Sequence, residues 1–362
     1  MTEDELGYLA LNALHLDPFK NQEMCRSLGP PAAFVTDAQA WREARDDEAE
    51  AQRRGISIVT GAAAALDAML PDLREPAPGS VPPVLYLEGD ARAIELPTVA
   101  LVGSRRASAY GLEVARHLGS ELGRRGIAVV SGLARGIDTA AHRGTLEAGG
   151  VTVAVLGSGL ARCYPKENGR LLRDIVATGL VMSEFPLFTP PLARNFPRRN
   201  RIIAALSDVV VVVEAAHGSG SRHTADSASS QAKTVMAVPG PMTSPTSAGC
   251  NALLRDGAQV VTGVEDVLQA LLTSRRWVGR KEIMKHVAAE PPPAQAPAPA
   301  SPLLSLLSVE SPKHVEAIAS ESCRQLPDVM AELQELVMAG AVQQHPGQLF
   351  QLRIAGHGNR GS

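Results

Sequence analysis

Short runs of apolar, mostly β-branched residues recur through the middle of the chain. They lie at Val99–Val102, Ile127–Val130, Val151–Leu156, Leu180–Met182, Val209–Val213, Thr234–Val238 and Gln259–Val261. Because these runs are mostly uninterrupted rather than alternating, they are typical of strands buried on both faces. The intervening segments, such as Gly111–Arg124 and Pro165–Thr178, are rich in helix formers, and Gly126 and Gly179 are their candidate stops. The pattern predicts an α/β fold with a mostly parallel, doubly wound sheet of about seven strands.

The two ends of the chain have different patterns. The amino-terminal part has helical periodicity, opens with a capping box at Thr2 and Glu5, and closes with the proline-rich stretch Pro76–Pro83. Near the other end, a segment rich in proline and alanine, Ala289–Pro302, predicts an extended linker. Beyond it we predict three short helices and a two-stranded hairpin, a winged helix, at Leu303–Leu307, Val315–Ala319, Val329–Val337, Ala341–Gln344 and Gln348–Leu352.

These patterns predict four segments. Residues 1–75 form a small helical domain, and residues 76–273 form the α/β domain. Residues 274–301 form a linker, and residues 302–355 form a winged-helix domain.

Charge is distributed unevenly between these segments. Residues 1–75 carry 7 Lys+Arg against 14 Asp+Glu, whereas residues 97–273 carry 18 against 13. A basic middle beside an acidic end predicts an anionic partner for the middle segment. Sixteen of its 18 basic residues are arginine, the side chain best suited to bidentate contacts with phosphate.

Several function classes are disfavoured by composition. The four cysteines are scattered without a CxxC spacing, which argues against a zinc site or a disulfide framework. The first residues are acidic, and no apolar run is long enough to span a membrane. We therefore expect a cytoplasmic protein that has no metal site and no membrane partner.

Two stretches that flank the valine run stand out as candidate chemistry. Arg194–Arg201 holds four arginines together with Phe196, and Gly218–Thr224 is a loop rich in glycine and serine. Guanidinium groups, a ring that can stack and a loop with accessible amides suit phosphates and unpaired bases. The alternative is an arginine-rich helix start on a solvated face, and these stretches alone do not separate the two.

Turns that contain glycine follow most of the predicted strands, at Gly103–Arg106, Ser131–Asp138, Gly157–Gly159, Gly218–Thr224 and Pro239–Gly240. In a parallel sheet all of these turns meet at the carboxyl edge, where ligands bind. None of them matches GxGxxG or GxxxxGK[ST], so the sequence predicts no dinucleotide or nucleotide cofactor. Many weak phosphate contacts along one edge favour a polymer as the ligand.

Some individual residues allow two interpretations. Asp138 and His142 are spaced as a metal-binding pair or an acid–base pair, but we favour a structural role with Asp138 as a helix cap. Glu184 and Glu214 are candidates for pairing with the arginines. Phe196 could stack on a base or anchor a helix in the core.

The motifs resemble those of the DNA processing protein A (DprA, also called Smf) family. The matching blocks follow the family order through the whole middle segment. They are Val99–Arg105, Ser131–Asp138 with Ala141 and His142, Ala154–Leu160 with Tyr164 and Pro165, Ser183 and Glu184, Asn195–Ala204, Val212–Ala215, Ser219–Ser221 and Ala237–Gly240.

This resemblance implies an extended Rossmann-like domain that forms a homodimer, beside a helix-hairpin-helix or SAM-like amino-terminal domain. It implies a protein without enzymatic activity that binds single-stranded DNA in natural transformation. Such a protein protects the incoming strand and loads the RecA recombinase onto it, with single-strand DNA-binding protein as a further partner. By position, the site would include Gly103, Ser104, Arg105, Gly132, Arg135, Phe196, Arg198, Asn200, Arg201, Ser219, Gly220 and Ser221. The arginine and glycine stretches add Arg106, Arg194, Arg199, Gly218 and Arg222.

Two further functional hypotheses follow from the same patterns. A Rossmann-like phosphoribohydrolase also has glycine-rich strand ends, but this chain lacks the PGGxGT motif and its following glutamate. A duplex-binding winged helix needs a basic recognition helix, whereas Leu326–Gly340 has three acidic residues and no basic ones. We therefore expect that the winged helix contacts protein rather than duplex DNA.

Overall fold

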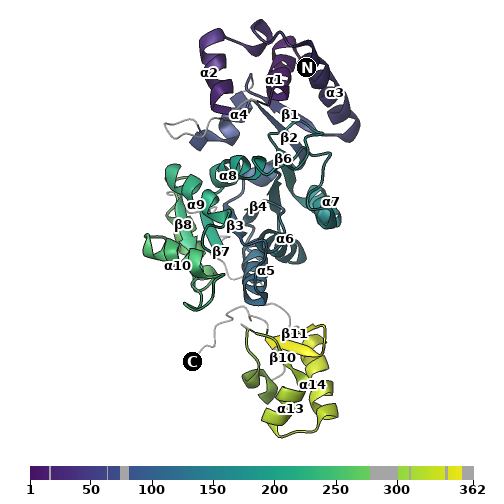
Figure 1. Cartoon of the computed structure of the whole chain (residues 1–362), viewed down its shortest axis with the longest axis vertical. Helices are drawn as coiled ribbons and strands as arrows, with labels where there is room; N and C mark the ends of the chain where they lie inside the picture. The colour runs from purple at the N-terminus through teal and green to yellow at the C-terminus, as the bar shows by residue number, and fades with distance from the viewer. Residues whose placement is uncertain are drawn as a thin grey trace.

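The computed structural model describes residues 1–15, 18–62, 64–73, 81–277, 301–309, 311–338 and 341–352. Its largest element is a nine-stranded sheet with the order β1-β2-β6-β5-β4-β3-β7-β8-β9 (Figure 1). The strands are β1 (Ser57–Thr60), β2 (Val84–Gly89), β3 (Thr98–Gly103), β4 (Ala128–Ser131), β5 (Thr152–Val155), β6 (Leu180–Ser183), β7 (Val209–Glu214), β8 (Thr234–Ala237) and β9 (Gln259–Val260).

The seven strands predicted from apolar runs are β3 to β9, and every pairing among them is parallel. The strand order reverses at β3, which has β4 on one side and β7 on the other. The predicted doubly wound, mostly parallel sheet is therefore confirmed.

The sheet extends further than we predicted. β1 and β2 add two antiparallel strands to the β6 edge, with Tyr86 of β2 opposite Ser183 of β6. β1 (Ser57–Thr60) lies within the segment predicted as a small helical domain and was not predicted as a strand. A four-residue strand beside a long helix gives too short an apolar pattern to be recognised.

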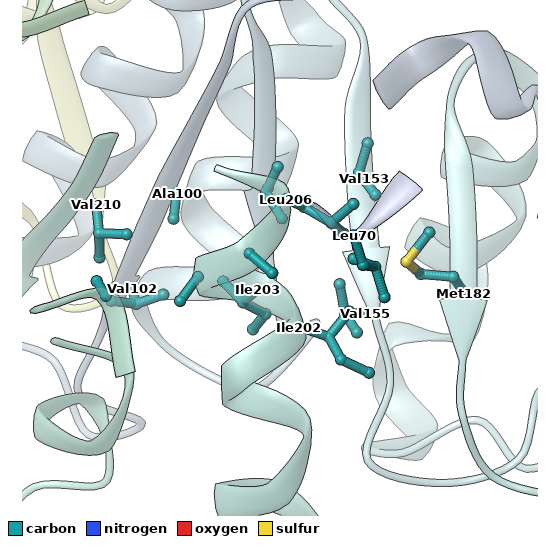
Figure 2. Close-up of a cluster of buried hydrophobic side chains, with 14 of the residues drawn as sticks. Leu70, Ala100, Val102, Val153, Val155, Met182, Ile202, Ile203, Leu206 and Val210 are labelled. Atoms are coloured by element: carbon teal, nitrogen blue, oxygen red, sulfur yellow. The ribbon is translucent and has the colours of Figure 1, made fainter. Parts of the chain in front are cut away.

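Helices cover both faces of the sheet. α5 (Ala109–Arg124), α6 (Ile137–Glu147), α7 (Gly169–Thr178) and α11 (Val264–Leu272) pack on one face. α8 (Asn195–Leu206), α9 (Ser221–Ser230) and α10 (Ala248–Arg255) pack on the other. Figure 2 shows Ile202, Ile203 and Leu206 of α8 beside strand residues such as Val102 and Val155, in one buried cluster. α8 contacts β3, β4 and β5, so it lies across the centre of the sheet.

The amino-terminal helices are α1 (Glu3–Ala13), α2 (Pro18–Leu28), α3 (Ala38–Arg54) and α4 (Ala64–Met69). The capping box is confirmed, because Thr2 Oγ1 accepts from the Glu5 amide and the Glu5 carboxylate accepts from the Thr2 amide.

Buried hydrogen bonds tie this part of the chain to the sheet. Asn12 Nδ2 donates to the carbonyl of Glu184 at 2.9 Å. Asp47 accepts from the Tyr86 hydroxyl at 2.7 Å and from the Leu187 amide at 3.1 Å.

The carboxyl-terminal part forms the predicted winged helix. It contains the 3-10 helix η5 (Pro302–Leu306), α13 (Val315–Ser322) and α14 (Leu326–Met338). A three-stranded sheet of β10 (Lys313–His314), β12 (Leu349–Leu352) and β11 (Val342–His345) completes it. The first predicted helix is thus a 3-10 helix, and β10 was not predicted. Most of the predicted linker, and Gly340, lie outside the described residues.

Among the described residues, no helix is long and apolar enough to cross a membrane.

Asp47 should make folding stability depend on pH. Burial raises the pKa of its carboxyl from 3.8 to about 6, against the lowering effect of its bonds to Tyr86 and Leu187. The folded state therefore favours the protonated form, and this stabilisation is lost as the pH rises from about 4 through 6. We expect Asp47→Asn to raise the free energy of unfolding at pH about 7.5 by about 1–3 kcal/mol, since one pKa unit is about 1.4 kcal/mol. At pH about 4 the gain should vanish.

Urea unfolding followed by tryptophan fluorescence at both pH values measures this difference. Asp46→Asn is the matched control, because the neighbouring Asp46 is exposed. A wild-type pH dependence in Asp47→Asn would contradict the assignment.

Candidate nucleic-acid interface

The glycine turns after the parallel strands meet at one edge, as predicted. The turn after β3 is bonded to its neighbours on both sides. Ser104 N donates to the Glu214 carbonyl at 2.7 Å, and the Ser104 carbonyl accepts from Ile137 N at 3.2 Å. These bonds join the ends of β3 and β7 to the start of α6 at the point where the strand order reverses, which is where open α/β sheets bind ligands.

α8 brings the arginine-rich stretch to the same edge. α8 follows β6 and precedes β7, and these two strands run in the same direction because every strand pairing between them is parallel. The chain therefore returns across the face of the sheet in α8, and α8 begins at the carboxyl edge. The four arginines then differ sharply in exposure: Arg194 is exposed, Arg198 is half-buried, and Arg199 and Arg201 are buried.

Arg198 and Arg201 share one buried carboxylate. Glu184 has 0% exposure, and its Oε2 lies 3.3 Å from Arg198 and 2.5 Å from Arg201. The predicted pairing of Glu184 with arginine is confirmed. For Glu214 the prediction is wrong, because its carboxylate accepts hydrogen bonds from the amide and hydroxyl of Ser108.

Arg199 occupies the interior below this edge. Its side chain donates to the carbonyls of Gly132, at 2.8 Å, and Val155, the ends of β4 and β5. Burial lowers the pKa of Arg199 to about 10, against the opposing effect of the nearby Asp138 carboxylate. Its side chain is only 3% exposed, and its role as a direct contact stays a prediction.

Phe196 lies at the surface end of this cluster. The Arg105 guanidinium carbon is 4.6 Å from the ring centroid, and that of Arg199 is 6.0 Å from it. The ring of Tyr164 is 5.8 Å away and tilted by 54°. Phe196 is half-buried, so it is neither a core anchor nor an uncovered stacking surface. A base at this position would meet the Arg105 guanidinium, whose plane can also stack.

The exposed cations complete the edge. Within the described parts of the chain, Arg105, Arg106 and Arg194 form no ion pair. Arg135 pairs with Glu167 at the surface, and Arg222 lies 3.4 Å from Asp256. Such exposed pairs are weak and can exchange for a phosphate.

A buried side chain of α8 holds the glycine–serine loop, Gly218–Thr224, in place. Asn200 Nδ2 donates to the carbonyl of Gly220 at 3.3 Å, and the hydroxyls of Ser219 and Ser221 are 2.9 Å apart. Asn200 is buried and links α8 to this loop, and its role as a DNA contact stays a prediction.

Asp138 and His142 do not form an acid–base pair. Asp138 lies in the first turn of α6 rather than at the cap, which is Gly136, and accepts from the amides of Gly132 and Ala134. His142 is fully buried, 2.7 Å from Thr152 Oγ1, and burial lowers its pKa to about 3. The structural role we favoured is confirmed, although the cap position was wrong.

Tyr164 is a member of this edge that we did not predict from the sequence. It is exposed and contacts Phe196. An aromatic residue in a turn after a predicted strand was the available signal.

Comparison with known proteins agrees with this architecture. The family model described as DNA recombination-mediator protein A matches residues 71–272, and the DprA winged helix domain matches residues 287–348. Protein Smf of Escherichia coli (strain K12) is 40% identical over 280 residues, which cover 77% of this chain and 74% of that protein. DNA processing protein DprA of Streptococcus pneumoniae is 44% identical over 191 residues, covering 52% and 66%.

Two solved structures are similar. The X-ray structure of DprA from Streptococcus pneumoniae has a TM-score of 0.62 and 31% identity, covering 74% of this chain and 98% of that one. DNA processing protein A from Helicobacter pylori, solved for its single-stranded DNA binding mode, has a TM-score of 0.52 and 31% identity, covering 60% and 95%.

The extended, mostly parallel sheet, the helical amino terminus and the winged helix define a Rossmann-like α/β protein with an accessory domain. The chain belongs to the DNA recombination-mediator protein A (DprA/Smf) family. The resemblance drawn from the motifs is thereby confirmed.

Gly132 should be required for the position of Arg199. A Cβ at this residue would lie 2.6 Å from the Arg199 guanidinium carbon, which its bonds to strand-end carbonyls hold in place. We expect Gly132→Ala to lower the free energy of unfolding by about 1–3 kcal/mol.

Urea denaturation would measure that loss. Gly220→Ala is the matched control, since a Cβ there has no neighbour within 4 Å and φ is −60°. That variant should stay within about 0.5 kcal/mol of wild type. Equal stabilities of the two variants would show that Arg199 can move without cost.

Proposed function

We propose that this protein binds single-stranded DNA without sequence preference and without enzymatic activity. The observation that carries the proposal is the carboxyl edge of the sheet, where exposed arginines lie beside the stacked pair Arg105 and Phe196. Guanidinium groups and loop amides suit backbone phosphates, and a planar cation over a ring suits unpaired bases of any identity.

The proposed site has two parts. The groups that would contact the strand lie along the carboxyl edge, where Phe196 is half-buried, Ser221 is buried at the start of α9 and the others are exposed or partly exposed: Gly103, Ser104, Arg105, Arg106, Arg135, Arg194, Phe196, Gly218, Ser219, Gly220, Ser221 and Arg222. The groups that would position them lie beneath: Gly132, Arg198, Arg199, Asn200 and Arg201.

Family membership supports a role in natural transformation. We propose that the protein protects incoming single-stranded DNA and loads the RecA recombinase onto it, as a cytoplasmic homodimer formed through the Rossmann-like domain, with single-strand DNA-binding protein as a further partner. The relatives' names as DNA processing proteins and the Helicobacter pylori structure solved for single-stranded DNA binding support this assignment.

We also propose the domain division at residues 1–75, 76–273, 274–301 and 302–355. The pairing of β1 with β2 places the last strand of the first segment in the sheet of the second. The two segments therefore share one sheet.

Removing Arg105 should weaken DNA binding. We expect Arg105→Ala to bind oligo-dT and oligo-dA about tenfold more weakly, or about 1.4 kcal/mol, and uniformly across sequences. Its plot of log affinity against log salt should flatten by about 0.7 for each phosphate that the variant no longer neutralises. Fluorescence anisotropy between about 50 and 200 mM NaCl measures both.

Arg92→Ala is the matched control. Arg92 is also exposed, although it pairs with Asp90 at 2.7 Å, and it follows β2, whose end at Gly89 pairs with Leu180 at the opposite edge of the sheet. An equal loss of DNA affinity in both variants would indicate a general charge effect and would contradict the proposed binding edge. Arg201→Ala is less informative, because it would strip a partner from the buried Glu184.

The phosphoribohydrolase alternative predicts a different outcome. That activity requires a carboxylate placed beside a bound nucleotide, whereas Glu214 is bonded to Ser108 and Asp138 is buried. We expect no free base when the protein is incubated with nucleoside monophosphates and the mixture is separated by chromatography. Base release that disappears in Glu214→Gln would overturn the binder assignment.

A further inference from the structure

A small pocket lies beside the start of α8, on the side next to the amino-terminal helices. It has a volume of about 70 Å³. Its walls come from His15 after α1, from Phe185 and Thr189 in the β6–α8 loop, and from Arg194, Asn195 and Arg198 at the start of α8. The space is sufficient for several waters, at about 10–15 Å³ each, and therefore for a small oxyanion.

Two buried polar groups in its wall lack a partner. Asn195 is 4% exposed and Thr189 is 7% exposed. Among the described residues, neither Asn195 Nδ2 nor Thr189 Oγ1 has a hydrogen-bond partner. Buried polar groups are almost always satisfied, so these two atoms indicate an acceptor that binds in the pocket.

The first turn of α8 adds positive potential. Its cap residue Arg194 makes no side-chain hydrogen bond to the helix amides, and the turn contains no acidic residue. Asn195 N already donates to the Leu192 carbonyl at 2.9 Å and Pro197 has no N–H, so the helix start contributes the positive end of its dipole rather than a set of free amides.

The side chains of this turn divide between two surfaces. Asn195 and Arg198, three residues apart, line the pocket, whereas Phe196 and Arg199 belong to the Arg105 stack. The pocket is therefore separate from that stack.

The charges around the pocket are mainly positive. Arg194 is exposed, and Arg198 shares the buried Glu184 with Arg201. Partial burial lowers the pKa of His15; Glu43 opposes that shift, while Arg194 and Arg198 add to it. Three arginines, Arg194, Arg198 and Arg201, against the carboxylates of Glu184 and Glu43 leave the region with a net positive charge.

We propose that this pocket binds a phosphate group through Asn195 Nδ2, the Thr189 hydroxyl and the Arg194 guanidinium. The phosphate belongs either to a DNA strand that continues past the Arg105 edge or to a free phosphate ion. Only the first source rests on the function proposed above. His15 contributes a wall from the amino-terminal segment, so the complete pocket requires that segment to be docked.

Two isosteric variants of the full chain test the pocket. Thr189→Val removes the hydroxyl, and Asn195→Asp replaces the donor with a carboxylate that repels an anion. Arg92→Ala is the control. The first arm titrates inorganic phosphate against chloride at equal ionic strength and follows the melting temperature. The second compares oligo-dT with a 5′-phosphate and with a 5′-hydroxyl by anisotropy.

A free-phosphate site predicts a saturable rise in melting temperature for wild type and Arg92→Ala. The apparent affinity for phosphate should fall about tenfold in Thr189→Val, and the rise in melting temperature should vanish in Asn195→Asp. A strand-phosphate site predicts instead that both variants lose about tenfold in oligo-dT affinity. Preference for the 5′-phosphorylated strand in wild type would identify a strand end.

The proposal is overturned if neither arm separates Thr189→Val and Asn195→Asp from wild type. It is equally overturned if phosphate raises the melting temperature no more than chloride does and all of the proteins bind oligo-dT with the same affinity. The proposed single-stranded DNA binding would not be contradicted by that result. If wild type does not bind oligo-dT but its melting temperature rises with phosphate, and Thr189→Val weakens that rise, the proposed DNA binding is contradicted and the phosphate pocket is supported.

Discussion

The structure of the carboxyl edge depends on how α8 carries positive charge into the protein interior. A buried guanidinium is tolerated only where carboxylates or carbonyls replace its water. Glu184 does this for Arg198 and Arg201, and the strand-end carbonyls of Gly132 and Val155 do it for Arg199. Because these acceptors come from β4, β5 and the segment after β6, three neighbouring strands are joined at the edge that faces the proposed ligand.

That arrangement divides one arginine-rich stretch into two functional groups. The side chains that point inward already bind these carboxylate and carbonyl acceptors, so they hold the geometry of the edge. Arg105 comes from a different turn and covers the Phe196 ring, so the exposed stack combines residues distant in the sequence. A strand bound along this edge would meet a preformed surface, which lowers the entropy lost on binding.

How much of the structure could be predicted depends on how far apart in the sequence the interacting residues lie. The strands β3 to β9 were recognised because burial on both faces leaves continuous apolar runs. The edge itself followed from the parallel topology. The burial of each arginine was not predictable, because the sequence does not distinguish Arg199 and Arg201 from Arg194. Only the residues that surround them in the fold make the first two buried and the third exposed. Glu214 illustrates the same limit: its partner is Ser108, 106 residues away in the sequence. The short strand β1 was missed because four residues beside α3 carry too little periodicity.

The reversal of strand order at β3 also has a consequence for how the chain assembles. The central pairing of β3 with β7 joins segments about 110 residues apart, as the bond from Thr98 N to Asp208 shows. Contacts of such separation form slowly, because a long loop must close before they contribute. During synthesis, β1 to β6 emerge before β7, and the apolar edge of β3 stays unpaired until the valines of β7 arrive. The half-made sheet is therefore the species most exposed to aggregation and to capture by chaperones.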